Sequence, residues 1–187
     1  MSIFTNIEKF NPGWKFTIFT AIILPILLSL SFWQYQRGLE KSKLESFINN
    51  QQTLPPTEFI SLEYASPSQW YRPFFMQGNF NEKTILVDNA IYGGARGFSV
   101  YQEFLSNSGI SLIVSKGWLE SFSQSEKTLN RNYLLQGVFR PIEKAFTIDN
   151  STSEKIESTL EMQSFDIDLV NTKWKTNYPA VVFELDE

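Results

Sequence analysis

One long apolar run near the start of the chain dominates the pattern of hydrophobic and polar positions. Residues 16–36 carry no charged side chain, and Lys15 and Arg37 bracket them. About 20 helical residues cross the roughly 30 Å hydrocarbon core of a bilayer. Both ends of the run also hold aromatic side chains of the kind found at membrane interfaces: Trp14, Phe16, Phe32, Trp33 and Tyr35. The pattern predicts a transmembrane helix.

We place this helix at residues 14–36, after an N-terminal tail of residues 1–13. Pro25 lies in its middle, where we expect it to kink the helix without ending it, as proline does in lipid. A cleaved signal peptide is the alternative interpretation. The segment before the run is long and of mixed charge, and no small-x-small cleavage site follows it, so the sequence favours a retained anchor.

Beyond the anchor the pattern changes to a polar, helix-compatible stretch and then to short strand-like runs. Residues 37–54 are interpreted as a juxtamembrane helix and linker, which Pro55 and Pro56 end. Residues 55–187 are predicted to form one β-rich domain. Its expected strands are 70–80, 84–91, 97–105, 110–119, 133–142 and 181–185.

Short turns join most of these runs, which indicates antiparallel pairing. A turn is expected at 81–83, and helices are expected at 123–132 and 161–172. The overall prediction is an α+β membrane-anchored fold, in which the N-terminal transmembrane helix precedes a mainly antiparallel β domain, a small barrel or sandwich, with short helices.

The glycine-rich stretch 93–97 invites comparison with a phosphate-binding loop. It lacks the Lys-Ser/Thr ending of such loops, and a strand follows it where a helix N-terminus is required. A hairpin turn whose glycines adopt positive φ is therefore the preferred interpretation.

Composition narrows the chemistry that the chain can supply. It contains no cysteine and no histidine, which removes thiol nucleophiles, cysteine-type metal sites, the usual general base and the usual haem axial ligand. We find no nucleophile–base set and no metal-ligand pattern, and we expect a protein that is not an enzyme.

The charge of the chain limits the binding partners that we expect. Three of the 16 basic and one of the 20 acidic residues lie at or before Arg37, which leaves 13 against 19 in the rest of the chain. An acidic domain is repelled by phosphate backbones, so nucleic acid is not an expected partner. Lys9 and Lys15 precede the uncharged run, and Arg37, Lys41 and Lys43 follow it. This excess of one basic residue leans toward a cytoplasmic domain.

Several short motifs together resemble a known family. They are Trp33-Gln34-Tyr-Gln36-Arg37, Pro73-Phe74, Gly78-Asn-Phe80, Val87-Asp88-Asn89, Gly97-Phe98-Ser-Val100, Lys116-Gly117-Trp118 and Gln136-Gly137-Val138-Phe139-Arg140. In this order and spacing they resemble the SURF1 family, the assembly factors of cytochrome c oxidase. The resemblance extends from about Trp14 to the end of the chain.

The resemblance implies a protein of the bacterial inner membrane with a periplasmic domain, or of the mitochondrial inner membrane with a domain in the intermembrane space. This is the opposite orientation to that of the charge count. It also implies action on oxidase subunit I or its assembly intermediates, with haem a as the candidate cofactor. Members of the family carry a second transmembrane helix after the domain and a candidate haem-ligating histidine toward it. This chain stops at Glu187 and has no histidine, so that role is not carried over.

The candidate contact residues fall into two groups. Trp33, Gln34 and Arg37 lie at the helix exit. Arg37 is suited to a carboxylate or a haem propionate, with a snorkelling interfacial anchor as an equal alternative, and interfacial anchoring is favoured for Trp33. Asp88, Asn89, Gly97, Gly117 and Trp118 lie at expected strand ends. For Asp88 and Asn89 turn capping is the default, and for Trp118 core or rim packing is favoured over a stacking platform.

Three functions remain open from the sequence. The first is an oxidase assembly factor that is tethered to the lipid bilayer and acts by binding subunit I, haem a or both. The second is an unrelated membrane-anchored extracytoplasmic binding or sensor domain without catalysis. The third is a cell-envelope enzyme, which the missing histidine and cysteine disfavour most.

Overall fold

The computed structural model describes residues 13–121, 131–142, 153–156 and 158–186. The chain forms two compact units, one ending at Phe47 and one beginning at Ile48. Each unit is described by itself.

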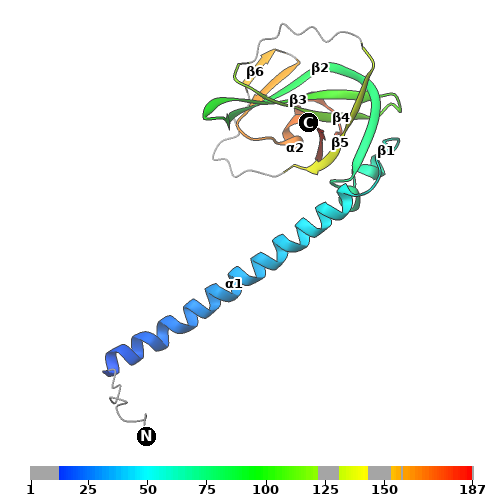
Figure 1. Cartoon of the computed structure of the whole chain (residues 1–187). Coiled ribbons are helices and arrows are strands. Elements are labelled where there is room, and N and C mark those ends of the chain that lie inside the picture. The colour runs from blue at the N-terminus through cyan, green and yellow to red at the C-terminus, as the bar shows by residue number, and fades with distance from the viewer. Residues whose placement is uncertain (1–12, 122–130, 143–152, 157, 187) are drawn as a thin grey trace. The chain divides into compact units, whose positions relative to one another are not determined.

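The first unit contains most of a single long helix, α1, Trp14–Gln52 (Figure 1). The helix contains both the apolar run and the polar stretch in which a helix was expected. It is long and apolar enough to cross a membrane, judged by length and composition, and none of its residues is buried. α1 continues through Pro25, as predicted, but Figure 1 shows it as a straight coil, so the expected kink is not seen. Four residues after the proline, the Ser29 hydroxyl donates to the Pro25 carbonyl at 2.8 Å, as helical serines often do.

The second unit is a small closed barrel, which confirms the mainly antiparallel β domain and decides between barrel and sandwich. Strand order around it is β3-β4-β8-β5-β2, and β2 pairs back onto β3 to close it. β4 and β8 run parallel, and the other neighbours in the ring run antiparallel. The five strands are β2 Pro73–Tyr92, β3 Ala95–Ser106, β4 Ser111–Leu119, β5 Tyr133–Pro141 and β8 Val181–Leu185.

Three short strands add to the sheet outside the ring, and two of them pair directly with β2. β7 pairs with it in parallel and β6 pairs with β7, while β1 pairs with the start of β2. Neither β1 nor the β6–β7 pair was predicted from the sequence. The smaller elements of the second unit are β1 Thr57–Glu58, β6 Ser153–Ile156, β7 Thr159–Met162, the 3₁₀ helices η1 Leu62–Ala65 and η2 Pro67–Gln69, and α2 Ile167–Trp174.

Three predicted elements require comment. The turn expected at 81–83 was wrong, because β2 continues through it as a β-bulge, two residues longer than the opposing stretch of β3. The helix expected at 161–172 was wrong at its start, since its first residues complete β7 and α2 begins only after the Asp166 N-cap. Within the stretch 123–132, residues 123–130 lie outside the described residues.

Two hydrophobic cores hold the domain together. The first fills the barrel with aromatic side chains, and Phe74, Phe104, Phe139 and Phe183 are each 0% exposed. The second contains residues of β2, β4, β7 and β8 together with Ile167 and Val170 of α2. The first core leaves the barrel interior filled by side chains, so candidate contacts must lie on its outside or at its ends.

Candidate functional site

The five strand residues selected from the sequence come together at one end of the barrel. Ala90 pairs with Gly97, Ser99 with Trp118 and Val100 with Gly117, so the ends of β2, β3 and β4 lie side by side. We call this end the hairpin tip and define it as residues 88–97 together with 117–119. The turn at its apex has Gly93 and Gly94 at φ of 57° and 85°, which confirms the predicted hairpin.

Asp88 and Asn89 do not end a strand, as expected from the sequence. β2 continues to Tyr92, and these two residues fall in a second β-bulge, between Val87 and Ala90. The bulge adds one residue to β2 relative to β3. The side chain of Asn89 lies outside what the structure describes, and Asp88 is half-buried.

Trp118 fixes the hairpin tip through a fit with Gly97. A Cβ atom at Gly97 would lie 2.3 Å from the Leu119 carbonyl oxygen and 2.6 Å from the Trp118 ring, so only glycine fits. The indole Nε1 donates to the Ala90 carbonyl at 2.9 Å, and the Tyr92 ring lies 5.7 Å away. Trp118 is half-buried, so its role is packing at the rim of the barrel. Gly117 beside it has a φ of 89° at a register shift in β4.

The surface that Trp118 supports is apolar and exposed. Ile91 is 71% exposed and Tyr92 is 70% exposed, and both values exceed those of the other large hydrophobic side chains described in the β domain. Leu119 at the end of β4 is 44% exposed.

The helix-exit residues Trp33, Gln34 and Arg37 all lie on α1, in the first unit, and are exposed. The Arg37 guanidinium carbon stands 5.5 Å from the centre of the Trp33 ring, a cation–π arrangement across one helical turn. This contact leaves the guanidinium N–H groups at the surface, where they can meet a carboxylate or a lipid headgroup.

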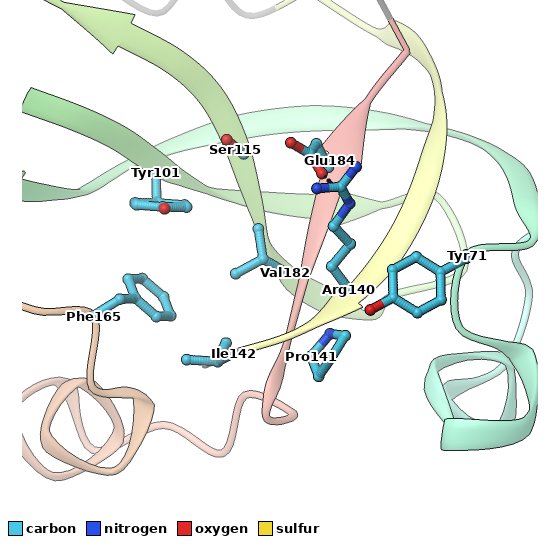
Figure 2. Close-up of a pocket in the computed structure, with 9 residues that line it drawn as sticks. All are labelled: Tyr71, Tyr101, Ser115, Arg140, Pro141, Ile142, Phe165, Val182 and Glu184. Carbon is cyan, nitrogen blue, oxygen red and sulfur yellow. Dashed lines mark ion pairs between the residues drawn. The ribbon is translucent and has the colours of Figure 1, made fainter. Parts of the chain in front are cut away.

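A pocket of about 400 Å³ lies on the outer face of the barrel (Figure 2). Arg140 of β5 and Glu184 of β8 form an ion pair on one side of it, and Tyr101 and Phe165 lie on the other with ring centres 4.6 Å apart. The remaining lining residues are Tyr71, Ser115, Pro141, Ile142 and Val182. An apolar wall with a paired donor and acceptor suits an amphipathic group.

Sequence reasoning did not select this pocket. Its lining comes from β3, β4, β5, β8 and three loop segments, so no local pattern marks it. The one available signal was Arg140, which ends the motif Gln136-Gly137-Val138-Phe139-Arg140 that carried part of the resemblance. The pKa of Tyr101 is raised by burial and by the nearby Glu184 charge, and a hydrogen bond with Ser99 opposes this. Its phenol therefore stays protonated at neutral pH and can donate a hydrogen bond.

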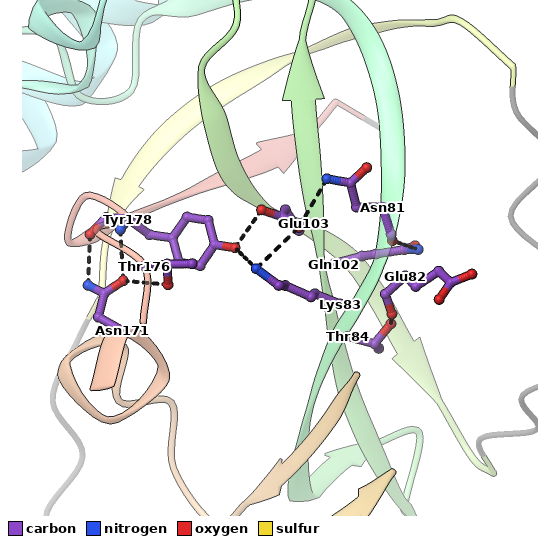
Figure 3. Close-up of polar contacts among 9 residues, drawn as sticks. All are labelled: Asn81, Glu82, Lys83, Thr84, Gln102, Glu103, Asn171, Thr176 and Tyr178. Carbon is purple, nitrogen blue, oxygen red and sulfur yellow. Dashed lines mark hydrogen bonds and ion pairs between the residues drawn. The ribbon is translucent and has the colours of Figure 1, made fainter. Parts of the chain in front are cut away.

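A buried polar network lies at the first bulge of β2 (Figure 3). The Glu103 carboxylate, whose residue is only 6% exposed, accepts from the Tyr178 hydroxyl at 2.5 Å and from the Asn81 amide at 3.0 Å. The Lys83 ammonium lies 3.9 Å from the same carboxylate and donates to the Tyr178 hydroxyl at 3.4 Å. Burial raises the pKa of Tyr178, and the Glu103 hydrogen bond and charge raise it further.

This network is a structural clamp. Asn171 accepts from the Tyr178 backbone N–H at 2.7 Å and donates to its carbonyl at 3.0 Å, which ties the end of α2 to the network. Both carboxylate oxygens of Glu103 have donors within the domain, so this carboxylate is satisfied without a ligand.

The chain offers little to a haem iron. It has no histidine or cysteine, and the methionines Met76 and Met162 are each 1% exposed within the two cores. No group of three or more acidic residues that could hold a metal ion occurs among the described residues. Axial ligation of haem a does not fit these residues, and no step is derived through it.

Comparison with known proteins gives one informative match. No curated protein matches the chain. The model of the SURF1 family matches residues 21–187, which include most of α1 and the whole β domain. An apolar helix followed by a closed barrel accompanies this match, so the helix and the family together indicate a membrane-anchored protein. The chain belongs to the SURF1 family, whose members serve in the assembly of cytochrome oxidase and are not a catalytic family.

Proposed function

We propose that this protein is a membrane-tethered assembly factor for haem–copper cytochrome c oxidase that acts by binding subunit I or its assembly intermediates. The observation that carries the proposal is the family match over residues 21–187, which covers the anchor and the domain together. In this proposal the domain lies in the periplasm beside a bacterial inner membrane, with the mitochondrial intermembrane space as the alternative. The tether is α1, inserted in the lipid bilayer.

Protein contact is the mode of action that the geometry favours. The barrel interior is filled by phenylalanine side chains, and the chain has no imidazole or thiolate. The contact surfaces are therefore external, namely the helix exit at Trp33, Gln34 and Arg37, the hairpin tip, and the Arg140–Glu184 pocket. Haem a stays a candidate ligand on the family resemblance alone, and its titration into the purified chain, followed by absorbance, tests it.

Deletion of the gene tests the assembly role. We expect the haem a-type oxidase activity of membranes to fall while other respiratory complexes keep their activity. Re-expression of the wild-type chain should restore the oxidase. Unchanged oxidase activity in the deletion strain would sink the proposal in favour of an unrelated membrane-anchored binding domain.

Arg37→Ala tests the helix exit as a contact surface. We expect this variant to lower oxidase activity in the complemented strain several-fold while the β domain stays folded, because Arg37 lies outside both cores. Lys41→Ala is the matched control, since it removes an exposed positive charge one turn further along α1. Equal effects of the two variants would show that general charge, and no specific contact by Arg37, is responsible.

A further inference from the structure

The hairpin tip ends in a narrow ribbon with one large exposed apolar side chain on each face, and Arg96 lies beside Ile91. Ile91 pairs with Arg96 and Tyr92 with Ala95, and the described residues provide no third strand beside these pairs. Adjacent residues of a strand point to opposite faces, so the 71% exposure of Ile91 and the 70% exposure of Tyr92 leave apolar surface on each side. Gly93 and Gly94 add no side chain at the apex.

The ribbon is held in this form by the barrel. Trp118 bonds to the Ala90 carbonyl immediately before Ile91, and its ring lies against Tyr92. Gly97 provides the space for that ring. The apolar end is therefore presented on a fixed support.

The shape and composition of the ribbon suit a bilayer better than a protein surface. A stable protein interface buries about 800 Å² on each partner, which is more than two exposed side chains supply. A two-residue apolar apex suits end-on insertion. Tyrosine and tryptophan carry an apolar body and a polar edge and gather at membrane interfaces, and the exposed Arg96 beside them can reach headgroups.

We propose that the hairpin tip is a second membrane contact, in which Ile91 and Tyr92 insert into the interface of the bilayer that α1 spans. This rests on the tether of the proposed function. The occupant is the lipid itself, and neutral lipid suffices, because the domain carries excess acidic residues and has no basic cluster at the tip. Two contacts would restrict the orientation of the domain at the membrane surface.

The absence of cysteine makes the test clean, since one introduced cysteine is the only labelling site. The full chain is reconstituted in phosphatidylcholine nanodiscs and carries one nitroxide, through Ile91→Cys or, separately, Tyr92→Cys. Leu134→Cys is the matched control, because Leu134 on β5 is 65% exposed and lies outside the tip. Leu27→Cys reports on α1. Electron paramagnetic resonance then measures how often each nitroxide collides with oxygen, which enters lipid, and with a nickel chelate, which stays in water.

We expect the labels at positions 91 and 92 to favour oxygen over the nickel chelate several-fold more than the label at position 134, and to resemble the label at position 27. If they match position 134 while position 27 reports lipid, the tip proposal fails and the tether stands. If position 27 also reports water, the tether and the tip proposal fail together. Shielding of positions 91 and 92 from both reagents would show a protein cover, such as a second copy, and would overturn the lipid proposal. Circular dichroism of each variant checks that the domain is folded.

Discussion

Two bulges interrupt the same strand, β2, and their surroundings differ. The first, between Phe80 and Thr84, brings Asn81 and Lys83 to the buried carboxylate of Glu103. The second, between Val87 and Ala90, leads to the exposed apolar apex of the hairpin tip. The first bulge is closed by partners within the domain, whereas the second, formed by Asp88 and Asn89, lies next to the exposed apolar side chains of Ile91 and Tyr92. We therefore assign the first bulge a role in the stability of the domain and the second a role in supporting a contact surface.

The two regions differ because a buried charge and an exposed apolar side chain have very different effects on the free energy of folding. A buried carboxylate without donors is strongly destabilising, so Glu103 keeps its hydrogen bonds within the domain. Exposed isoleucine and tyrosine cost the folded domain little, so they persist where another surface can cover them. Changes at the first bulge should therefore reduce stability, and changes at the second should affect contacts more.

The largest effect is expected from Glu103→Ala. It leaves the Tyr178 hydroxyl and the Asn81 amide without their acceptor and Lys83 without its counter-charge, and we expect a loss of about 3–5 kcal/mol in the free energy of unfolding. Chemical denaturation of the domain measures it. Glu58→Ala, at an exposed carboxylate on β1, is the control and should change stability by no more than about 0.5 kcal/mol. A loss below about 1 kcal/mol for Glu103→Ala would contradict the clamp.

Gly97→Ala should have the next largest effect. Its Cβ meets a backbone carbonyl at 2.3 Å as well as the Trp118 ring, and the backbone cannot move aside cheaply, so we expect a loss of about 3 kcal/mol. Near-UV circular dichroism should also report a displaced Trp118. Gly38→Ala is the matched control, because nothing lies within 4 Å of its Cβ position on α1, and it should be neutral or slightly stabilising. Equal stability of the two variants would show that the tip adjusts freely.

The sequence predicted those features whose cause is local. The apolar run, the hairpin glycines and most barrel strands follow from neighbouring residues, and they appear in the structure close to their expected bounds. The stretch 81–83 was interpreted as a turn because polar residues of this kind favour turns. The contacts of this bulge are instead distant in sequence, since Asn81 bonds to Glu103 and Lys83 bonds to Tyr178.

The candidate site shows the same division between local and distant causes. The ends of β2, β3 and β4 could be matched as strand ends, so Gly97, Gly117 and Trp118 were selected together and lie together. The exposure of Ile91 and Tyr92 could not be foreseen, because β-branched and aromatic residues in a strand usually indicate a buried face. The Arg140–Glu184 pocket depends on the pairing of β5 with β8, which closes the barrel from the end of the chain.

Trp118→Ala should cost less than a core truncation. The sequence allowed about 3–5 kcal/mol if this residue were in the core, but it is half-buried and makes one hydrogen bond and one ring contact. We expect a loss of about 2 kcal/mol. Phe104→Ala, at a residue 0% exposed inside the barrel, is the comparison and should cost about 3–5 kcal/mol. Thermal denaturation of both variants measures the difference, and equal losses would place Trp118 in the core.

The smallest effect concerns pH and returns to the first bulge. The pKa of Tyr178 is raised by burial and by Glu103, so the folded domain keeps this proton at a pH where the unfolded chain, with an ordinary pKa of about 10, releases it. The stabilisation is fully present below pH 10 and is lost as pH rises toward the folded pKa, by at most about 1.4 kcal/mol per pH unit for one group. Tyr178→Phe should flatten this alkaline decline, whereas Tyr133→Phe, outside the network, should leave it unchanged. Urea denaturation between about pH 9 and pH 11 measures the slopes. A decline that persists in Tyr178→Phe but is lost in Tyr101→Phe, whose phenol also has a pKa raised by burial, would move the alkaline sensitivity from the clamp to the pocket.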